Sequence, residues 1–141
     1  MSLGEELYKD IILEHCANPA HQGTLERFTH SHVGFNPLCG DEIELQLLIE
    51  EGVVQDVRFR GEGCSISQAS ASMLTQEVTG KTLEEVARLS EAFKAWMKER
   101  GSLPSMDIGD LEALAGVRSY PVRIKCALLP WTTLHEALKG T

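Results

Sequence analysis

The chain has 141 residues, of which 43% are apolar and 24% charged, and its 13 basic and 21 acidic residues give a net charge of −8. This length and composition are typical of a folded domain with its own core and exclude a disordered chain. The acidic balance argues against a general nucleic-acid-binding or anionic-membrane role, because both need concentrated Lys and Arg. We therefore expect residues 1–141 to form a single domain.

The N-terminal stretch M-S-L-G-E-E-L-Y-K-D is acidic and lacks a long apolar core, and no apolar run in the chain is long enough to span a bilayer. We therefore expect a cytoplasmic protein. Its four cysteines, at positions 16, 39, 64 and 126, are then expected to be reduced rather than disulfide-bonded. No two of them form a C-x-x-C pair, so the strong zinc-finger and thioredoxin signatures are absent.

The first part of the chain predicts a helix, a loop and a short strand. A helix is expected over residues 2–16, because apolar residues recur near helical spacing and Ser2 with Glu5 fits a capping box. Residues 18–32 are rich in turn-formers and look like a loop. Residues 32–36 fit a short strand.

A β-hairpin is the clearest local pattern in the sequence. From Ile43 to Ile49, apolar residues alternate with mostly polar ones, which is the period of a half-buried strand. Gly52 supplies a turn with freedom at positive φ. The stretch V-V-Q-D-V-R-F-R then predicts the return strand, with Val57 and Phe59 on its inner face.

Helices are predicted for the rest of the chain. After the glycine-rich G-E-G-C, the stretch S-I-S-Q-A-S-A-S-M-L-T-Q-E-V predicts a helix of small residues. Thr82 and Glu85 fit a capping box for the next helix, residues 107–115 suggest a short helix, and a final helix is expected over residues 121–139. One helix, a small antiparallel sheet and then several helices indicate an α+β fold rather than a doubly wound parallel sheet.

The stretch N-P-L-C-G-D, at residues 36–41, sets a thiol and a carboxylate two positions apart. If residues 39–41 are extended, Cys39 and Asp41 point the same way and can face one ion, with Gly40 allowing close approach of the backbone. Alternatively, Asp41 simply caps a turn, which is the simpler interpretation on spacing alone.

Two further cysteines lie at expected element boundaries. Cys64 follows G-E-G and would lie near the N-terminus of the next helix, where the helix dipole favours a thiolate. Cys126 lies four residues before Pro130, which cannot donate a hydrogen bond to the Cys126 carbonyl. The last helix is therefore either kinked there or begins near Cys126. Both geometries leave polar backbone beside the thiol.

Three such cysteines and one aspartate would make a donor set of three sulfurs and one oxygen, which suits zinc with Zn–S distances of about 2.3 Å. Thiolates also bind iron–sulfur clusters, usually four per cluster, and a carboxylate in place of one thiolate is expected to make a cluster less permanent. Each cysteine could instead be a small buried apolar residue, and we favour that interpretation for Cys16.

Other polar residues near these motifs also have alternative interpretations. His30 and His32 are alternative metal ligands, although solvated loop residues are the simpler interpretation. Arg123 and Lys125 either lower the pKa of Cys126 or form an exposed basic face.

Taken together and in this order, F-N-P-L-C-G-D, F-R-G-E-G-C-S-I-S-Q-A-S-A-S and R-I-K-C resemble the IscU/SufU/NifU-N family of iron–sulfur cluster assembly proteins, over nearly the whole chain. The resemblance implies a three-stranded antiparallel sheet with helices packed against it. It also implies that the metal or cluster ligands are Cys39, Asp41, Cys64 and Cys126. Cys39 would in addition accept sulfur from a cysteine desulfurase.

Two departures from the IscU pattern favour the SufU branch. IscU-type members usually have a histidine just before the last cysteine, where this chain has Lys125, and their segment between Cys64 and Cys126 is usually shorter. The SufU resemblance implies a zinc-dependent sulfur-transfer protein, in which a desulfurase histidine replaces Cys39 on the zinc. In that protein Arg123 would either steer the anionic persulfide or tune the site. The implied alternative is a scaffold that assembles a transient 2Fe–2S cluster on the same ligands and transfers it to apo-proteins.

The resemblance also implies the partners. The sulfur donor would be a SufS-like cysteine desulfurase, and that protein would hold the pyridoxal phosphate, since nothing in this sequence suggests a site for it. Downstream iron–sulfur assembly proteins would receive the sulfur or the cluster.

Overall fold

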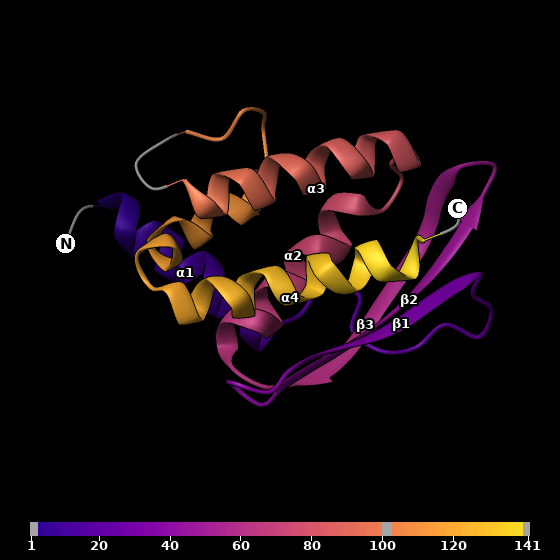
Figure 1. Cartoon of the computed structure of the whole chain (residues 1–141), viewed down its shortest axis with the longest axis horizontal. Coiled ribbons are helices and arrows are strands. Elements are labelled where there is room, and N and C mark those ends of the chain that lie inside the picture. The colour runs from indigo at the N-terminus through magenta and orange to yellow at the C-terminus, as the bar shows by residue number, and fades with distance from the viewer. Residues whose placement is uncertain (1–2, 100–102, 140–141) are drawn as a thin grey trace.

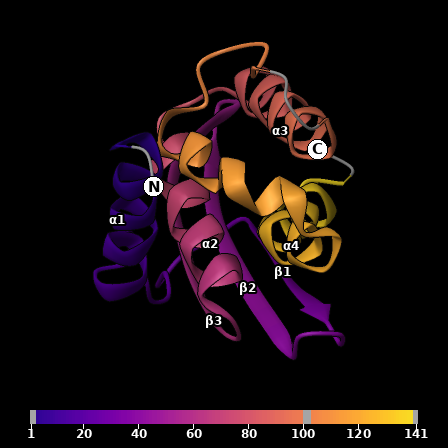
Figure 2. The same cartoon turned by 90° about the vertical axis from the view of Figure 1, so that its left-hand side faces the viewer.

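The computed structural model describes residues 3–99 and 103–139, and Figure 1 shows it as a cartoon. The fold is α+β, with the helices gathered on one side of a small antiparallel sheet (Figures 1 and 2). Along the chain, one helix precedes the strands and the remaining helices follow them. This is the segregated arrangement that the sequence pattern predicts.

The sheet has the spatial order β1–β2–β3, and both neighbouring pairs are antiparallel. β1 covers His30–Asn36, β2 covers Asp41–Glu50 and β3 covers Val53–Glu62. The alternation in the hairpin places one side of β2 and β3 in the core, where the fully buried residues include Ile43, Leu45, Leu47, Val57 and Phe59. The predicted hairpin and its inner face are confirmed.

The register of β1 against β2 determines which residues lie opposite each other at the end of the sheet. Asn36, the last residue of β1, pairs with Asp41, the first residue of β2. Residues 37–40 therefore form a tight turn that joins the two strands at one end of the sheet.

The helices follow the sequence predictions closely. The described elements are α1 (Leu3–Ala17), α2 (Ser65–Val78), α3 (Leu83–Lys98), the 3-10 helix η1 (Gly109–Ser119) and α4 (Pro121–Ala137). The capping box of Thr82 and Glu85 is confirmed at the start of α3. The capping box expected at Ser2 lies outside the described residues. The short helix expected near residues 107–115 is a 3-10 helix that begins later and extends to Ser119.

The bounds of α4 show which of the two geometries allowed by Pro130 is present. The helix begins at Pro121, where a proline suits the first turn, and it continues through Pro130 to Ala137. It does not begin near Cys126. This cysteine instead lies within α4, and its side chain is fully buried.

α2 packs against the sheet, α1 and α4, because its small residues allow close approach. Ala69 and Ala71 are fully buried, and the Ser70 hydroxyl donates a 2.6 Å hydrogen bond to the carbonyl of Ala127 in α4. No helix in the described part of the chain is long and apolar enough to cross a membrane. The fold thus joins the N-terminal halves of α2 and α4, which are the halves that lie next to Cys64 and contain Cys126.

Candidate metal centre

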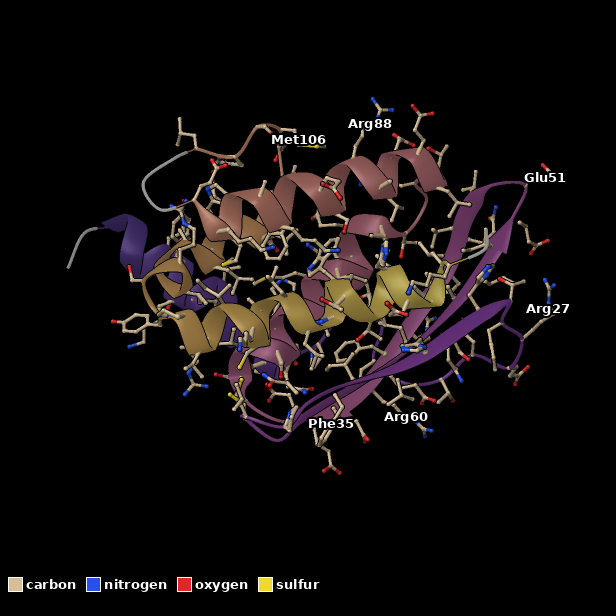
Figure 3. All side chains as sticks on the ribbon, viewed as in Figure 1. Arg27, Phe35, Glu51, Arg60, Arg88 and Met106 are labelled. Carbon is tan, nitrogen blue, oxygen red and sulfur yellow. The ribbon has the colours of Figure 1, made fainter. Side chains whose placement is uncertain are left out.

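Three parts of the chain meet at one end of the sheet: the turn between β1 and β2, the junction between β3 and α2, and the start of α4. Ligand atoms of Cys39, Asp41 and Cys126 all lie within 4.8 Å of one another. The Sγ atoms of Cys39 and Cys126 are 3.2 Å apart. Cys64 lies beside this group, with its Sγ 3.8 Å from Oδ2 of Asp41. Figure 3 shows sulfur atoms gathered near the start of α4 and the end of the sheet.

The local geometry at Cys39 distinguishes between the two alternatives that the sequence left open. Residues 37–40 form a turn in which Gly40 has φ +68°, so residues 39–41 do not have the extended geometry that was one of the two alternatives. Positive φ is the left-handed region, which glycine adopts without steric cost. The turn, rather than the two-residue period of a strand, brings Cys39 and Asp41 to the same site.

Asp41 is completely buried and anchors the next cysteine. Its Oδ1 accepts a 2.7 Å hydrogen bond from the backbone N–H of Cys64, while Oδ2 faces the Cys64 thiol. Gly63, at φ +139°, makes this possible, because a Cβ there would lie 2.1 Å from Oδ1 of Asp41. Oδ1 of Asp41 therefore fixes the β3–α2 junction, while Oδ2 remains available as a ligand.

Cys64 is the N-cap residue of α2, as the sequence predicted, and its side chain makes no capping hydrogen bond. Its Sγ is instead directed toward Asp41 and toward the Ser67 hydroxyl, 3.9 Å away. The thiol therefore does not cap α2 and is available as a ligand.

Cys126 has the most enclosed thiol of the group. Burial raises the pKa of Cys126, and its hydrogen bonds with Cys39 and Asp41 and the neighbouring Cys64 raise it further. Burial and the neighbouring acidic groups thus dominate the pKa of Cys126, and the exposed positions of Arg123 and Lys125 fit the alternative of a basic face. Arg123 is exposed, and the charge of Cys64, followed by that of Cys126, raises the pKa of the Arg123 guanidinium. Arg123 thus places a positive charge near two of the thiols.

The chemistry of these donors fits a zinc ion. Thiolate sulfur and carboxylate oxygen are both zinc ligands, and three thiolates with one carboxylate suit the tetrahedral coordination of zinc. Asp41 is buried, yet it forms no ion pair with a lysine or arginine among the described residues. A buried carboxylate beside thiols needs a positive charge, and a divalent cation would supply it.

Neither the two histidines considered as alternative ligands nor the fourth cysteine, Cys16, belongs to the close group of ligand atoms found among the described residues. His30 and His32 are in β1, and within the described ranges no histidine joins the close group of ligand atoms. Cys16 is half-buried at the end of α1, where its thiol donates a 3.3 Å hydrogen bond to the carbonyl of Ser65. Burial, and then the charge of Cys64, raises the pKa of Cys16.

Asn36 also contacts this group, although no sequence pattern pointed to this contact. Asn36 is buried, and its Nδ2 donates a 3.7 Å hydrogen bond to the Sγ of Cys126. The only sequence signal was that Asn36 opens the N-P-L-C-G-D stretch, where an asparagine before a proline is typical of a turn.

Comparisons with known proteins agree with this architecture. The family model described as the NifU-like N terminal domain matches residues 7–127. The chain is 42% identical to the zinc-dependent sulfurtransferase SufU of Bacillus subtilis, over 95% of this chain and 90% of that protein. It is 40% identical to the iron–sulfur cluster assembly scaffold protein IscU of Thermotoga maritima, over 94% of this chain and 93% of that protein.

Solved structures give the same result. A crystal structure from Fervidobacterium islandicum, described as an iron–sulfur cluster assembly scaffold protein for the SUF system, has a TM-score of 0.86 and 33% identity. The match covers 96% of this chain and 98% of that one. The three motifs, the three-stranded sheet with its helices and these matches lead to one conclusion: the chain belongs to the IscU/SufU/NifU-N family of iron–sulfur cluster assembly proteins.

Proposed function

We propose that this protein is a zinc-dependent sulfur-transfer protein that accepts persulfide sulfur on Cys39 from a cysteine desulfurase. The position of Cys39 carries this proposal. Cys39 is half-buried on a turn, whereas Cys126 is fully buried within a helix and the backbone of Cys64 is tied to Asp41. Cys39 is therefore the thiol that can leave the group without disturbing a helix or a strand.

In this proposal the metal is held by Cys39, Asp41, Cys64 and Cys126. A bound zinc ion supplies positive charge that keeps the thiols deprotonated. The Cys39 thiolate then attacks the terminal sulfur of the desulfurase persulfide. An S–S bond forms on Cys39 while the S–S bond of the donor breaks, and the donor cysteine leaves as a thiolate, so no net oxidation or reduction occurs.

The surface around Cys39 suits a protein partner. Leu38, next to Cys39, is 67% exposed, and Phe35 at the end of β1 is 62% exposed and points away from the helices (Figure 3). Exposed apolar side chains of this size gather at protein interaction sites. Arg123 would add a positive charge that attracts the anionic persulfide. We propose a SufS-like, pyridoxal-phosphate-dependent desulfurase as the donor, and downstream iron–sulfur assembly proteins as the acceptors.

Intact-protein mass spectrometry tests sulfur transfer directly. The zinc-loaded protein is incubated with the desulfurase and cysteine, and a sulfur adduct of about 32 Da is expected. Peptide mapping should place the adduct on Cys39, and a Cys16→Ala variant should carry it equally well. No adduct and no faster desulfurase turnover would contradict the proposal, and cluster formation after addition of iron and sulfide would then favour a scaffold.

The scaffold function is the second candidate, and the mixed donor set favours it. A carboxylate among three thiols is expected to hold a cluster less permanently than a fourth thiolate would. In that function the protein would assemble a transient 2Fe–2S cluster on the same residues and transfer it to apo-proteins. The relatives that bear the name of scaffold support this alternative.

Replacing Asp41 tests whether its carboxylate makes the site labile. Asp41→Ala is expected to retain a reconstituted cluster longer than the unmodified protein, measured as the decay of its visible absorbance. Asp41→Asn is the matched variant, because its amide oxygen can still accept the hydrogen bond from Cys64 N–H. Faster decay in both variants would show that the carboxylate is an ordinary stabilising ligand.

A further inference from the structure

The side chain of Asn36 contacts two parts of the metal centre at once. Its Oδ1 accepts a 3.3 Å hydrogen bond from the backbone N–H of Leu38, within the turn that carries Cys39. Its Nδ2 donates a hydrogen bond to the Sγ of Cys126, 3.7 Å away in α4. Asn36 is only 8% exposed, so water competes little for either bond.

The hydrogen-bond pattern fixes the orientation of this amide. The Leu38 N–H can only donate, so it must meet the amide oxygen rather than the amide nitrogen. The amide N–H group then necessarily faces the sulfur of Cys126. The opposite orientation would place two donors against each other at Leu38.

We propose that Asn36 is the positioning residue of the metal centre: it ties the turn of Cys39 to Cys126 and thereby sets how readily Cys39 leaves the donor set. The inference rests on the proposed metal-binding role of these residues. It does not depend on whether Cys39 receives sulfur, because it concerns the geometry of the ligands alone.

The chemistry of the amide suits both contacts. An N–H group that donates to a ligating sulfur stabilises the charge on that sulfur and fixes its direction, and loss of such a partner typically lowers metal affinity about 10- to 100-fold. The amide oxygen of Asn36 meanwhile accepts the hydrogen bond from Leu38 N–H and so fixes the turn that carries Cys39. The register of the sheet adds to this, because Asn36 pairs with Asp41 and so lies level with a second proposed ligand.

Two substitutions separate the two contacts. Asn36→Asp keeps an oxygen for Leu38 N–H but removes the donor to Cys126, whereas Asn36→Ala removes both. Asparagine occurs at one other position, Asn18, whose side chain bonds to Glu14 on the exposed end of α1. Asn18→Asp and Asn18→Ala are therefore matched controls.

The first measurement is metal binding without any partner protein. Zinc affinity is measured by competition with a chromophoric chelator, and cobalt(II) is used as a probe through its sulfur-to-metal charge-transfer absorption. Both Asn36 variants are expected to bind zinc about 10-fold or more weakly and to shift the cobalt band, whereas the Asn18 variants should not. Unchanged affinity and an unchanged band in both Asn36 variants would overturn the proposal.

The second measurement is the rate at which iodoacetamide alkylates Cys39 in the metal-free protein, located by peptide mass. Asn36→Ala is expected to raise this rate several-fold by releasing the turn, and Asn36→Asp to leave it near that of the unmodified protein. Equal rates in all three proteins would refute the link to the turn. Far-ultraviolet circular dichroism identifies any variant that has lost its fold, and the Asn36→Asp comparison then carries the test. A protein that forms no sulfur adduct but shows these differences would refute the proposed function and leave the role of Asn36 standing.

Discussion

Replacing Cys39 by alanine is expected to lower sulfur acceptance by about 10³-fold or more, because removal of a reacting nucleophile leaves no group of equal chemistry in its place. The neighbouring thiol of Cys126 lies only 3.2 Å away, yet it is buried within α4 and cannot reach a partner protein. The adduct of about 32 Da in intact-protein mass spectra is the readout.

Cys126→Ala is the matched control for that experiment. Each variant lacks one thiol of the same close pair, so both are expected to bind zinc more weakly. Only Cys39→Ala should lose the adduct, while Cys126→Ala should still form it on Cys39 at a lower rate. Equal loss in the two variants would mean that metal retention, and not the nucleophile, limits the reaction, and would contradict the role assigned to Cys39.

Replacing Gly63 by alanine is expected to destabilise both the fold and the site. The new Cβ would lie 2.1 Å from Oδ1 and 2.8 Å from Cα of Asp41, and the backbone φ of +139° is itself strained for any residue with a side chain. The junction must shift, and the 2.7 Å hydrogen bond between Cys64 N–H and Asp41 is lost with it. Strain of this kind and a lost hydrogen bond to a buried carboxylate together cost roughly 3–5 kcal/mol of unfolding free energy.

Gly52→Ala provides the comparison for Gly63→Ala. Gly52 also has positive φ, at +73°, but a Cβ there would meet nothing within 4 Å. This control is therefore expected to lose only about 1–2 kcal/mol, the steric cost of the left-handed region. Urea unfolding of both variants gives the free energies, and chelator competition gives the zinc affinity. A Gly63→Ala protein that unfolds like Gly52→Ala and keeps its affinity for zinc would contradict a tight packing of Gly63 against Asp41.

Local patterns predicted most of the fold. The alternation from Ile43 to Ile49 and the return strand through Phe59 specify a hairpin, because a one-residue slip would move every apolar side chain to the solvent side. The capping box at Thr82 and Glu85 specified the start of α3, since its two hydrogen bonds are made within four residues. The sequence around Pro130 allowed either a kinked helix or a helix that begins near Cys126. The choice between them depends on tertiary packing, which the local sequence does not show.

The candidate site was less accessible to sequence reasoning. Spacing alone could not show that Cys39 and Cys126, 87 positions apart, lie in contact, and the family resemblance supplied that link. Spacing alone left open whether residues 39–41 are extended or lie in a turn, because two-residue spacing is compatible with both geometries. Asn36 was not identified, because a hydrogen bond to a distant sulfur leaves no local pattern in the sequence.

The order in which the site's parts occur along the chain has a consequence for its synthesis. A ribosome that makes the protein completes the turn of Cys39 and the junction at Cys64 long before α4, which brings Cys126. Until α4 packs against α2 and β1, the thiols of Cys39 and Cys64 lack the helix that covers them in the folded protein. We expect nascent chains to remain unable to retain metal until nearly the whole domain has emerged, so that metal acquisition would report on completed folding.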